Sequence, residues 1–308
     1  MSKYPVHEDL RLTQNEFSSF ESEADLVIGI DFGTTFTGVA FGLAEKDSTA
    51  NASQDRRRIA EKVVVIRSWP GASNADKIPT VLLYNANPPS WGVKVKATDE
   101  PRVANFKLGL QENIREHYKK RQLSSGTPSD PSILGGFLYD HNWRHPQLPG
   151  KEPIDFTADY LTQIVQYVLK ERLPMQYGKQ FLQNQQISYV ITVPAIWSDK
   201  AKELTRQAAV RAGITRRKLM LITEPEAASL YCATLCKEVD LKKGDRFCIC
   251  DAGGGTVVPR HSIYLNGNCR ISFHIKFFQL IHFQLRSVVL AQELHAGPSI
   301  LIESLKNF

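Results

Sequence analysis

Two stretches far apart in the chain share one pattern of residues. Each has an apolar strand, an aspartate, a glycine- and threonine-containing turn and a further β-branched residue. The first is VIGIDFGTTFTGVAFG, residues 27–42, and the second is FCICDAGGGTV, residues 247–257. A turn of this kind exposes backbone N–H groups and forms an anion site, for which phosphate is a common ligand. The repeat therefore predicts a duplicated fold that holds a nucleotide between its two copies.

The residue types of the first turn fit a phosphate and a magnesium ion. Gly33 lets the backbone approach a ligand closely and tolerates a positive φ, and Thr34 and Thr35 add hydroxyl groups. Asp31 follows the strand expected at Leu26–Ile30; phosphate would repel its carboxylate, whereas a hydrated Mg²⁺ that bridges phosphates would bind it. An ordinary hairpin with a tight turn is the alternative for either stretch taken alone. The corresponding residues of the second stretch are Asp251, Gly253 and Thr256.

Composition limits the classes of function that the chain can serve. Its 308 residues are enough for two domains, and 42% apolar with 23% charged residues is ordinary for a soluble globular protein. The net charge of +6 resides in clusters without interleaved aromatic residues, which favours a solvated surface over a nucleic-acid groove. No apolar run is long enough for a transmembrane helix, so no membrane role is expected. Five cysteines without a CxxC pair, and no signal peptide, predict a cytoplasmic or nuclear protein without a zinc site.

Local signals predict alternating strands and helices. The best helix is expected at residues 155–172 and should end at Pro174. A strand at 187–193 should stop at Pro194 and be followed by a helix at 199–212. The alternation predicts α/β architecture. Further strands are expected at 63–66, 81–84 and 219–223, and a further helix at 226–235.

Four ordered motifs resemble a known family. IGIDFGTT (28–35), VPAIWSDKAKELTRQAAVRAG (193–213), ITEPEAASL (222–230) and CDAGGGTV (250–257) follow one another as in the nucleotide-binding domain of heat-shock protein 70 relatives. FGTTFTGVAFG, the WPG turn and FKLGL look most like the divergent fungal and animal branch related to heat-shock protein 70 member 12. The resemblance covers about residues 26–257.

The resemblance implies an actin-like ATPase fold of the ribonuclease H type, in which two lobes close on ATP and Mg²⁺. It implies that Glu224 helps to order magnesium and the attacking water, and that Lys107 is the catalytic lysine that neutralises charge on the γ-phosphate. Without it, Lys107 would be taken for a surface lysine and Glu224 for a carboxylate at a helix N-terminus. Client proteins or co-chaperones are the implied partners. The residues that match the phosphate motifs are Asp31, Gly33, Thr34 and Thr35, and Asp251, Gly253, Gly254, Gly255 and Thr256, with the two aspartates on the metal side.

The resemblance ends after the second motif. The family has an aspartate where this chain has Val258, and residues 258–308 contain no Asp, no Thr and only two Glu. We expect a tail at 1–25, a complete first lobe at 26–245, and at 246–308 the start of a truncated second lobe with an aberrant C-terminal tail. An isolated hairpin is marginal in water, so the chain is expected to bind ATP–Mg²⁺ more weakly than about 100 μM.

Three functions remain open at this point. The first is a heat-shock protein 70-like ATPase domain, impaired by truncation. The second is a sugar kinase of the same superfold, which would need a carboxylate base beside a sugar pocket. The third is a non-catalytic interaction module or a gene-model fragment, which the short second lobe favours. The motifs at 193–197 and 222–228 favour the chaperone branch over the kinase.

Overall fold

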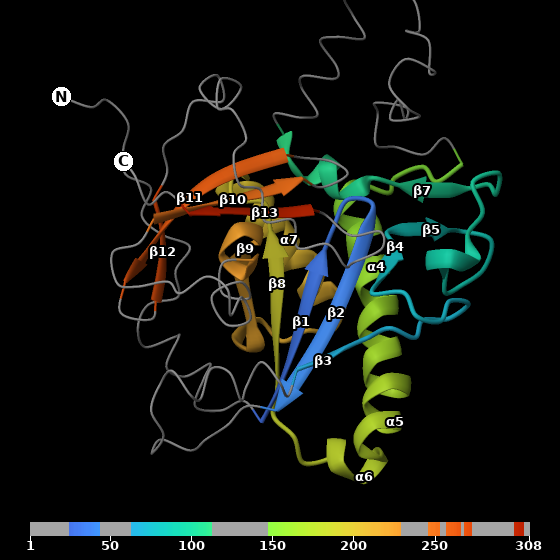
Figure 1. The fold of residues 1–308 in the computed structure, drawn as a ribbon. Helices are drawn as coiled ribbons and strands as arrows, with labels where there is room; N and C mark the ends of the chain where they lie inside the picture. The colour runs from blue at the N-terminus through green and yellow to red at the C-terminus, as the bar shows by residue number, and fades with distance from the viewer. Residues whose placement is uncertain are drawn as a thin grey trace, which may run out of the picture.

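The structure is a computed structural model, and it describes residues 25–43, 63–112 and 147–228 with their side chains. It also describes the backbone of four further strands between residues 246 and 304. The predicted tail at 1–25 and the predicted Gly253–Thr256 turn lie outside the described residues, apart from Asp25. Figure 1 shows the arrangement.

A six-stranded mixed sheet forms the centre of the described part. Its order is β3-β2-β1-β8-β9, with β4 paired to the first residues of β2, Phe36 to Gly38. β1 is antiparallel to β2 but parallel to β8, and β8 is parallel to β9. The carboxyl ends of β1, β8 and β9 therefore meet at one edge, where ligands bind in open α/β sheets. The strands are β1 (Leu26–Phe32), β2 (Phe36–Leu43), β3 (Val64–Val65), β4 (Lys77–Pro79), β8 (Ile187–Val193) and β9 (Leu219–Thr223).

The side chains of β1 alternate between a face that packs into the core and the opposite face, which carries Asp31. Leu26, Ile28, Ile30 and Phe32 alternate along the strand and are all buried in the main hydrophobic core. Successive side chains of a strand point to opposite faces, so Asp31 lies on the face away from this core. The strand reaches Phe32, two residues beyond the predicted end.

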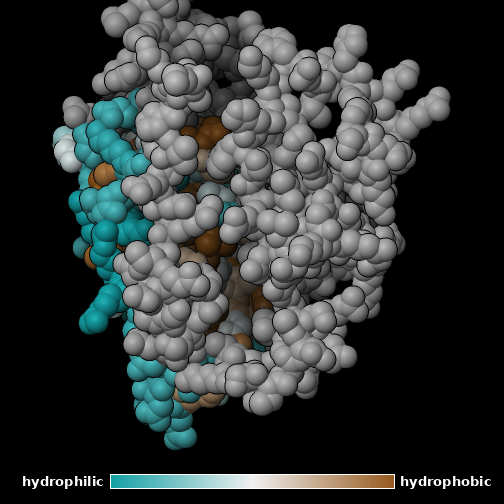
Figure 2. Space-filling view, turned by 90° about the vertical axis from the view of Figure 1, so that its left-hand side faces the viewer, coloured by the Kyte–Doolittle hydropathy of each residue, from teal (hydrophilic) through white to brown (hydrophobic). Residues whose placement is uncertain are grey.

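Helices cover the core face of the sheet, behind it in Figure 1. The long helix α4 (Pro153–Tyr167) starts with a capping box of Glu152 and Asp155. As predicted, the Ser198 side chain caps α7 (Asp199–Arg211), and Gly213 follows at a φ of +94°. Figure 2 shows hydrophilic residues along the outer edge of the described part and apolar residues further in.

The prediction that the long helix ends at Pro174 was wrong. A π-helical turn, η3 (Val168–Arg172), follows α4, and the helix continues as α5 (Leu173–Tyr177). The N–H of Leu173 bonds the carbonyl of Val168, five residues back. This wider turn places Pro174 in the first turn of a new segment, where its missing N–H is tolerated. A short helix, α6 (Lys179–Leu182), completes this end of the molecule.

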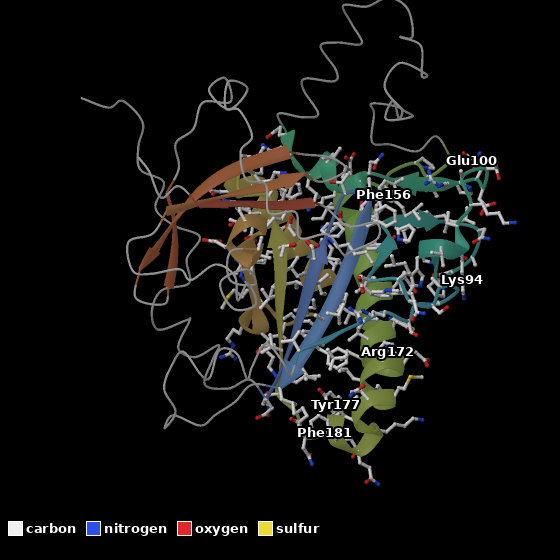
Figure 3. All side chains as sticks on the ribbon, in the orientation of Figure 1. Lys94, Glu100, Phe156, Arg172, Tyr177 and Phe181 are labelled. Atoms are coloured by element: carbon white, nitrogen blue, oxygen red, sulfur yellow. The ribbon has the colours of Figure 1, made fainter. Side chains whose placement is uncertain are left out.

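A smaller three-stranded sheet lies beside the central one, on the right in Figure 1. It has the order β6-β5-β7. Aromatic rings join it to α4: Phe156 lies 5.8 Å from Tyr84 and 6.5 Å from Phe106, between ring centroids. Figure 3 labels Phe156 at this end of α4, and Tyr177 and Phe181 at the opposite end of the helical segment. The strands of the smaller sheet are β5 (Val81–Leu83), β6 (Ser90–Trp91) and β7 (Arg102–Ala104), and two 3-10 helices, η1 (Gly92–Lys94) and η2 (Phe106–Leu110), follow β6 and β7 in the chain.

The second hairpin is present, but the expectation that it stands isolated was wrong. β10 pairs antiparallel with β11 as predicted, and also with β13 on its other side, in a four-stranded sheet ordered β12-β11-β10-β13. The strand at 299–304 was not predicted, because the composition of the C-terminal segment led us to expect an aberrant tail. The strand nevertheless has the apolar, β-branched residues that sheets favour. The weak ATP affinity expected above thus loses this support. The strands are β10 (Arg246–Ala252), β11 (Val257–Leu265), β12 (Asn268–Ser272) and β13 (Ser299–Ser304).

The described part has the predicted α/β character, and it is consistent with an actin-like ATPase fold. The strands at 187–193 and 219–223 have the predicted bounds. Among the described helices, none is long and apolar enough to cross a membrane.

The aromatic contacts of Phe156, near the start of α4, should contribute to the stability of the fold. Phe156 is 1% exposed, so Phe156→Ala should lower the free energy of unfolding by about 3–5 kcal/mol through lost burial and a cavity. Urea denaturation measures this. The control is Met175→Ala: Met175 is 75% exposed, and its truncation should change the value by less than about 0.5 kcal/mol. Equal effects of the two changes would contradict the packing described.

Candidate phosphate site

The register of β1 and β8 places a threonine beside the first aspartate. Ile30 pairs with Ile191 in the parallel ladder, so the next residues, Asp31 and Thr192, lie side by side on the opposite face. The Thr192 hydroxyl donates a hydrogen bond of 2.8 Å to Oδ1 of Asp31. One oxygen of the Asp31 carboxylate is thereby oriented from the neighbouring strand.

Lys77, from β4, contacts the other oxygen of Asp31. Its Nζ lies 2.6 Å from Oδ2 of Asp31. Burial alone would raise the pKa of Asp31, but the charge and hydrogen bond of Lys77, helped by Lys107 and Thr192, hold that pKa below its ordinary value of 3.8. Asp31 is therefore a carboxylate at neutral pH, and its side chain remains 41% exposed.

Backbone and side-chain contacts from Thr80 hold the first turn in shape. The N–H of Thr80 donates to the carbonyl of Thr35 at 2.8 Å, and its hydroxyl donates to the carbonyl of Gly33 at 2.9 Å. Gly33 is required for space and not, as predicted, for a positive φ: a Cβ there would lie 2.0 Å from the carbonyl oxygen of Phe36. Thr34 and Thr35 are partly exposed. The backbone of the turn thus lies close to the solvent-exposed side of the turn.

Lys107 is buried between the ends of two strands, whereas a lysine taken alone is usually exposed. Its side chain is 2% exposed, and its Nζ donates to Oε1 of Glu224 at 2.7 Å and to the carbonyl oxygen of Phe32. The Nζ also lies 5.4 Å from the ring centroid of Phe32 and 5.5 Å from that of Trp197. These contacts compensate the burial of the ammonium group.

A helix start positions Glu224. The N–H and hydroxyl of Thr223 donate to Oε2 of Glu226 at 2.9 and 2.8 Å, and the N–H of Glu226 reaches back to the Thr223 hydroxyl at 3.3 Å. This reciprocal capping box starts a helix at Glu224, directly after β9. The helix thus begins two residues earlier than predicted, and the T-x-x-E spacing was a sequence signal for it.

The second hairpin repeats the backbone register of the first. Asp31 pairs with Gly38, and Asp251 pairs with Val258, seven positions later in each case. The last ladder pairs, Phe32 with Thr37 and Ala252 with Val257, each enclose four residues. The register supports the predicted duplication. The Asp251 side chain and residues Gly253, Gly254, Gly255 and Thr256 lie outside the described residues.

The structure thus brings five separate segments to one edge of the central sheet. Of the predicted residues, Asp31, Gly33, Lys107 and Glu224 lie at the carboxyl ends of β1 and β9 or bridge them. The sequence did not point to three further site residues, because their roles depend on strand register. These residues are Lys77, Thr80 and Thr192.

The described site fits a hydrated magnesium ion bound together with phosphate better than a metal held by protein alone. No cluster of three metal-binding side chains occurs among the described residues. Magnesium usually keeps several waters and binds one or two carboxylates plus substrate phosphates. The partly exposed Asp31 carboxylate and the backbone-lined turn at Gly33 meet that requirement.

Comparisons with known proteins give one consistent family. A scan against models of protein families found no match. Human heat shock 70 kDa protein 12A is 30% identical over 223 residues, 68% of this chain, and human heat shock 70 kDa protein 12B is 26% identical over 255 residues, 79% of the chain. A chaperone protein HscA homolog of Acinetobacter baumannii is 27% identical over 262 residues, 80% of the chain. The matched region spans only 29%, 32% and 34% of these relatives.

The buried pair of Lys107 and Glu224 should behave as a unit. Lys107→Met and Glu224→Gln should each lower the free energy of unfolding by about 3 kcal/mol, because each leaves the charge of its partner without the opposite charge. The double variant should lose at least about 1 kcal/mol less than the sum of the two. Urea denaturation of the four proteins measures the coupling.

An exposed pair supplies the control for this cycle. Lys200 and Glu112 lie 2.8 Å apart with 63% and 55% of their side chains exposed, so Lys200→Met should change the free energy of unfolding by less than about 1 kcal/mol. Additive effects of the Lys107 and Glu224 changes would contradict the contact.

Proposed function

Because the chain is related to the heat shock 70 kDa proteins, we propose that residues 26–257 bind ATP with Mg²⁺ and hydrolyse it by attack of water on the γ-phosphate. The observation that carries the proposal is the meeting of Asp31, the Gly33 turn, Lys107 and Glu224 at one edge of parallel strands. Binding and hydrolysis of a nucleoside triphosphate need this combination of a backbone cradle, a cation and carboxylates.

Each group has a distinct task in this proposal. Thr80 holds the turn from behind by donating hydrogen bonds to the carbonyl groups of Gly33 and Thr35. The N–H groups of residues 33–35 therefore face the phosphates. Lys107 offers positive charge to the leaving γ-phosphate, and Glu224 accepts a hydrogen bond from the attacking water. Glu224 is the more accessible partner, with 15% of its side chain exposed against 2% for Lys107.

Magnesium would be held through water by Asp31 and, on the second hairpin, by Asp251. When bound, the ion neutralises charge on the phosphate oxygens. Thr192 keeps Asp31 oriented, because its hydroxyl donates to one carboxylate oxygen and leaves lone pairs on both oxygens for water.

Partners and biological process are proposals of a second order. One relative bears the name of a chaperone, and we infer that client proteins or co-chaperones are the partners of this chain. A sugar kinase of the same superfold remains the rival for the reaction itself, and a non-catalytic interaction module remains the rival for the class of function.

ATP binding should depend on the absence of a side chain at Gly33. Gly33→Ala should weaken ATP binding by at least about tenfold, since its Cβ would strike the carbonyl of Phe36 at 2.0 Å and open the turn. Gly29→Ala, on the strand β1 that leads into the turn, is the matched control, because its Cβ would lie 3.8 Å from the nearest atom, the carbonyl oxygen of Ala40. Calorimetry with ATP–Mg²⁺ distinguishes them, and equal affinities would count against a phosphate turn.

The reaction should need no acceptor other than water. The full chain should release phosphate from ATP without sugar, and Asp31→Asn should slow this release by about tenfold or more through weaker positioning of the metal. Asp159→Asn should leave the rate unchanged: its carboxylate also lies 2.6 Å from the Nζ of a lysine, Lys151, but Asp159 is in the middle of α4. Turnover that appears only with a hexose or polyol, with little basal hydrolysis, would favour the kinase.

A further inference from the structure

Three neighbouring strands place one lysine in line with the phosphate-site aspartate. In the ladders of the central sheet, Asp31 of β1 pairs with Gly38 of β2, and Gly38 pairs with Lys77 of β4. The three residues therefore form one row across the sheet. Directly paired residues lie on the same face, so Lys77 and Asp31 share the face that carries the site.

The middle residue of this row leaves a path for the lysine side chain. Lys77 and Asp31 are two strands apart, yet their charged atoms are 2.6 Å apart. A Cβ on Gly38 would lie 3.3 Å from Cγ and 3.6 Å from Cε of Lys77. The aliphatic part of Lys77 thus lies over Gly38, where any larger residue would crowd it, and its ammonium group reaches Asp31 beside the phosphate turn.

The pair changes the charge of the site. Among the described residues that meet there, Asp31 and Glu224 are carboxylates, and Lys77 and Lys107 are ammonium groups. The described half of the site is therefore neutral before any metal binds. An ammonium group carries three N–H donors, so Lys77 can hold Asp31 and still donate to a phosphate oxygen. A hydrated divalent ion held near Asp31 would lie beside this ammonium charge, so it would add less to phosphate binding than it would at an aspartate without a lysine partner.

We propose that Lys77 is a resident cation of the phosphate site, and that ATP binding by this chain consequently depends little on Mg²⁺. The proposal rests on the ATP-binding function above and adds a specific residue to it. Lys77 supplies the positive charge that phosphate oxygens require, Gly38 admits its side chain, and Asp31 fixes its position. The metal then contributes to hydrolysis more than to binding.

The test compares ATP affinity with and without the metal in the full chain. Calorimetry is run in EDTA and in excess Mg²⁺ at matched ionic strength, because surface charges are screened by salt. Wild-type affinities should agree within about threefold. Lys77→Met should weaken binding in EDTA by about tenfold and binding in Mg²⁺ much less. Lys77→Arg keeps the charge and should retain most of the metal-free binding.

A matched pair elsewhere supplies the control. Lys151→Met removes the lysine partner of Asp159, at the same 2.6 Å separation, and should leave both affinities unchanged. A measurement on the wild-type protein avoids any folding defect of Lys77→Met. In the nitrogen-15 lysine side-chain spectrum, the ammonium signal that Lys77→Arg lacks should shift when sodium tripolyphosphate is added without metal.

The outcomes separate this proposal from the function on which it rests. ATP binding that requires Mg²⁺ equally in the wild type and in Lys77→Met, or a Lys77 signal that ignores tripolyphosphate, overturns the role of Lys77 and leaves the ATP-binding function standing. The absence of ATP binding under every condition overturns both. Metal-free binding that is lost in Lys77→Met and kept in Lys151→Met supports the resident cation.

Discussion

The parallel pairing of β1 with β8 is the constraint on which the site depends. It gives β1 a partner on both sides, buries Ile30 and Ile191 in one core, and so turns Asp31 and Thr192 together toward the other face. The same pairing brings the end of β1 close enough to the end of β9 for Lys107 to bridge them. An ammonium group with 2% exposure is stable there only because carboxylate and carbonyl oxygens accept its hydrogen bonds.

Elements with local signals could be predicted closely, and elements defined by distant partners could not. The strand at 187–193 ends at Pro194, and α7 has a serine cap and a terminal glycine, so neighbours in sequence fix their bounds. The three-residue strand β4 carries no such signal and exists because β2 offers it an edge. Its Lys77 was therefore missed as a site residue. Lys107 was identified by family resemblance, since its partner lies 117 residues away.

The C-terminal segment shows the limit of composition as a guide to pairing. Residues 258–308 lack Asp and Thr, which led us to expect a tail outside the fold. Strand pairing, however, is made by backbone groups that every residue except proline offers in full. The run Ser299–Ser304 supplies a strand, and β10 becomes an inner strand between β11 and β13. Composition alone therefore did not predict that this segment adds a strand to the sheet.

The two hairpins share a register but differ at the residue opposite the aspartate. Gly38 pairs with Asp31, whereas Val258 pairs with Asp251. Glycine leaves the row across the sheet open, and Lys77 crosses it to reach a carboxylate two strands away. Val258 is branched at Cβ, so the second hairpin does not repeat the glycine that pairs with the first aspartate. The two hairpins thus share a backbone register and differ in the residue that pairs with the aspartate.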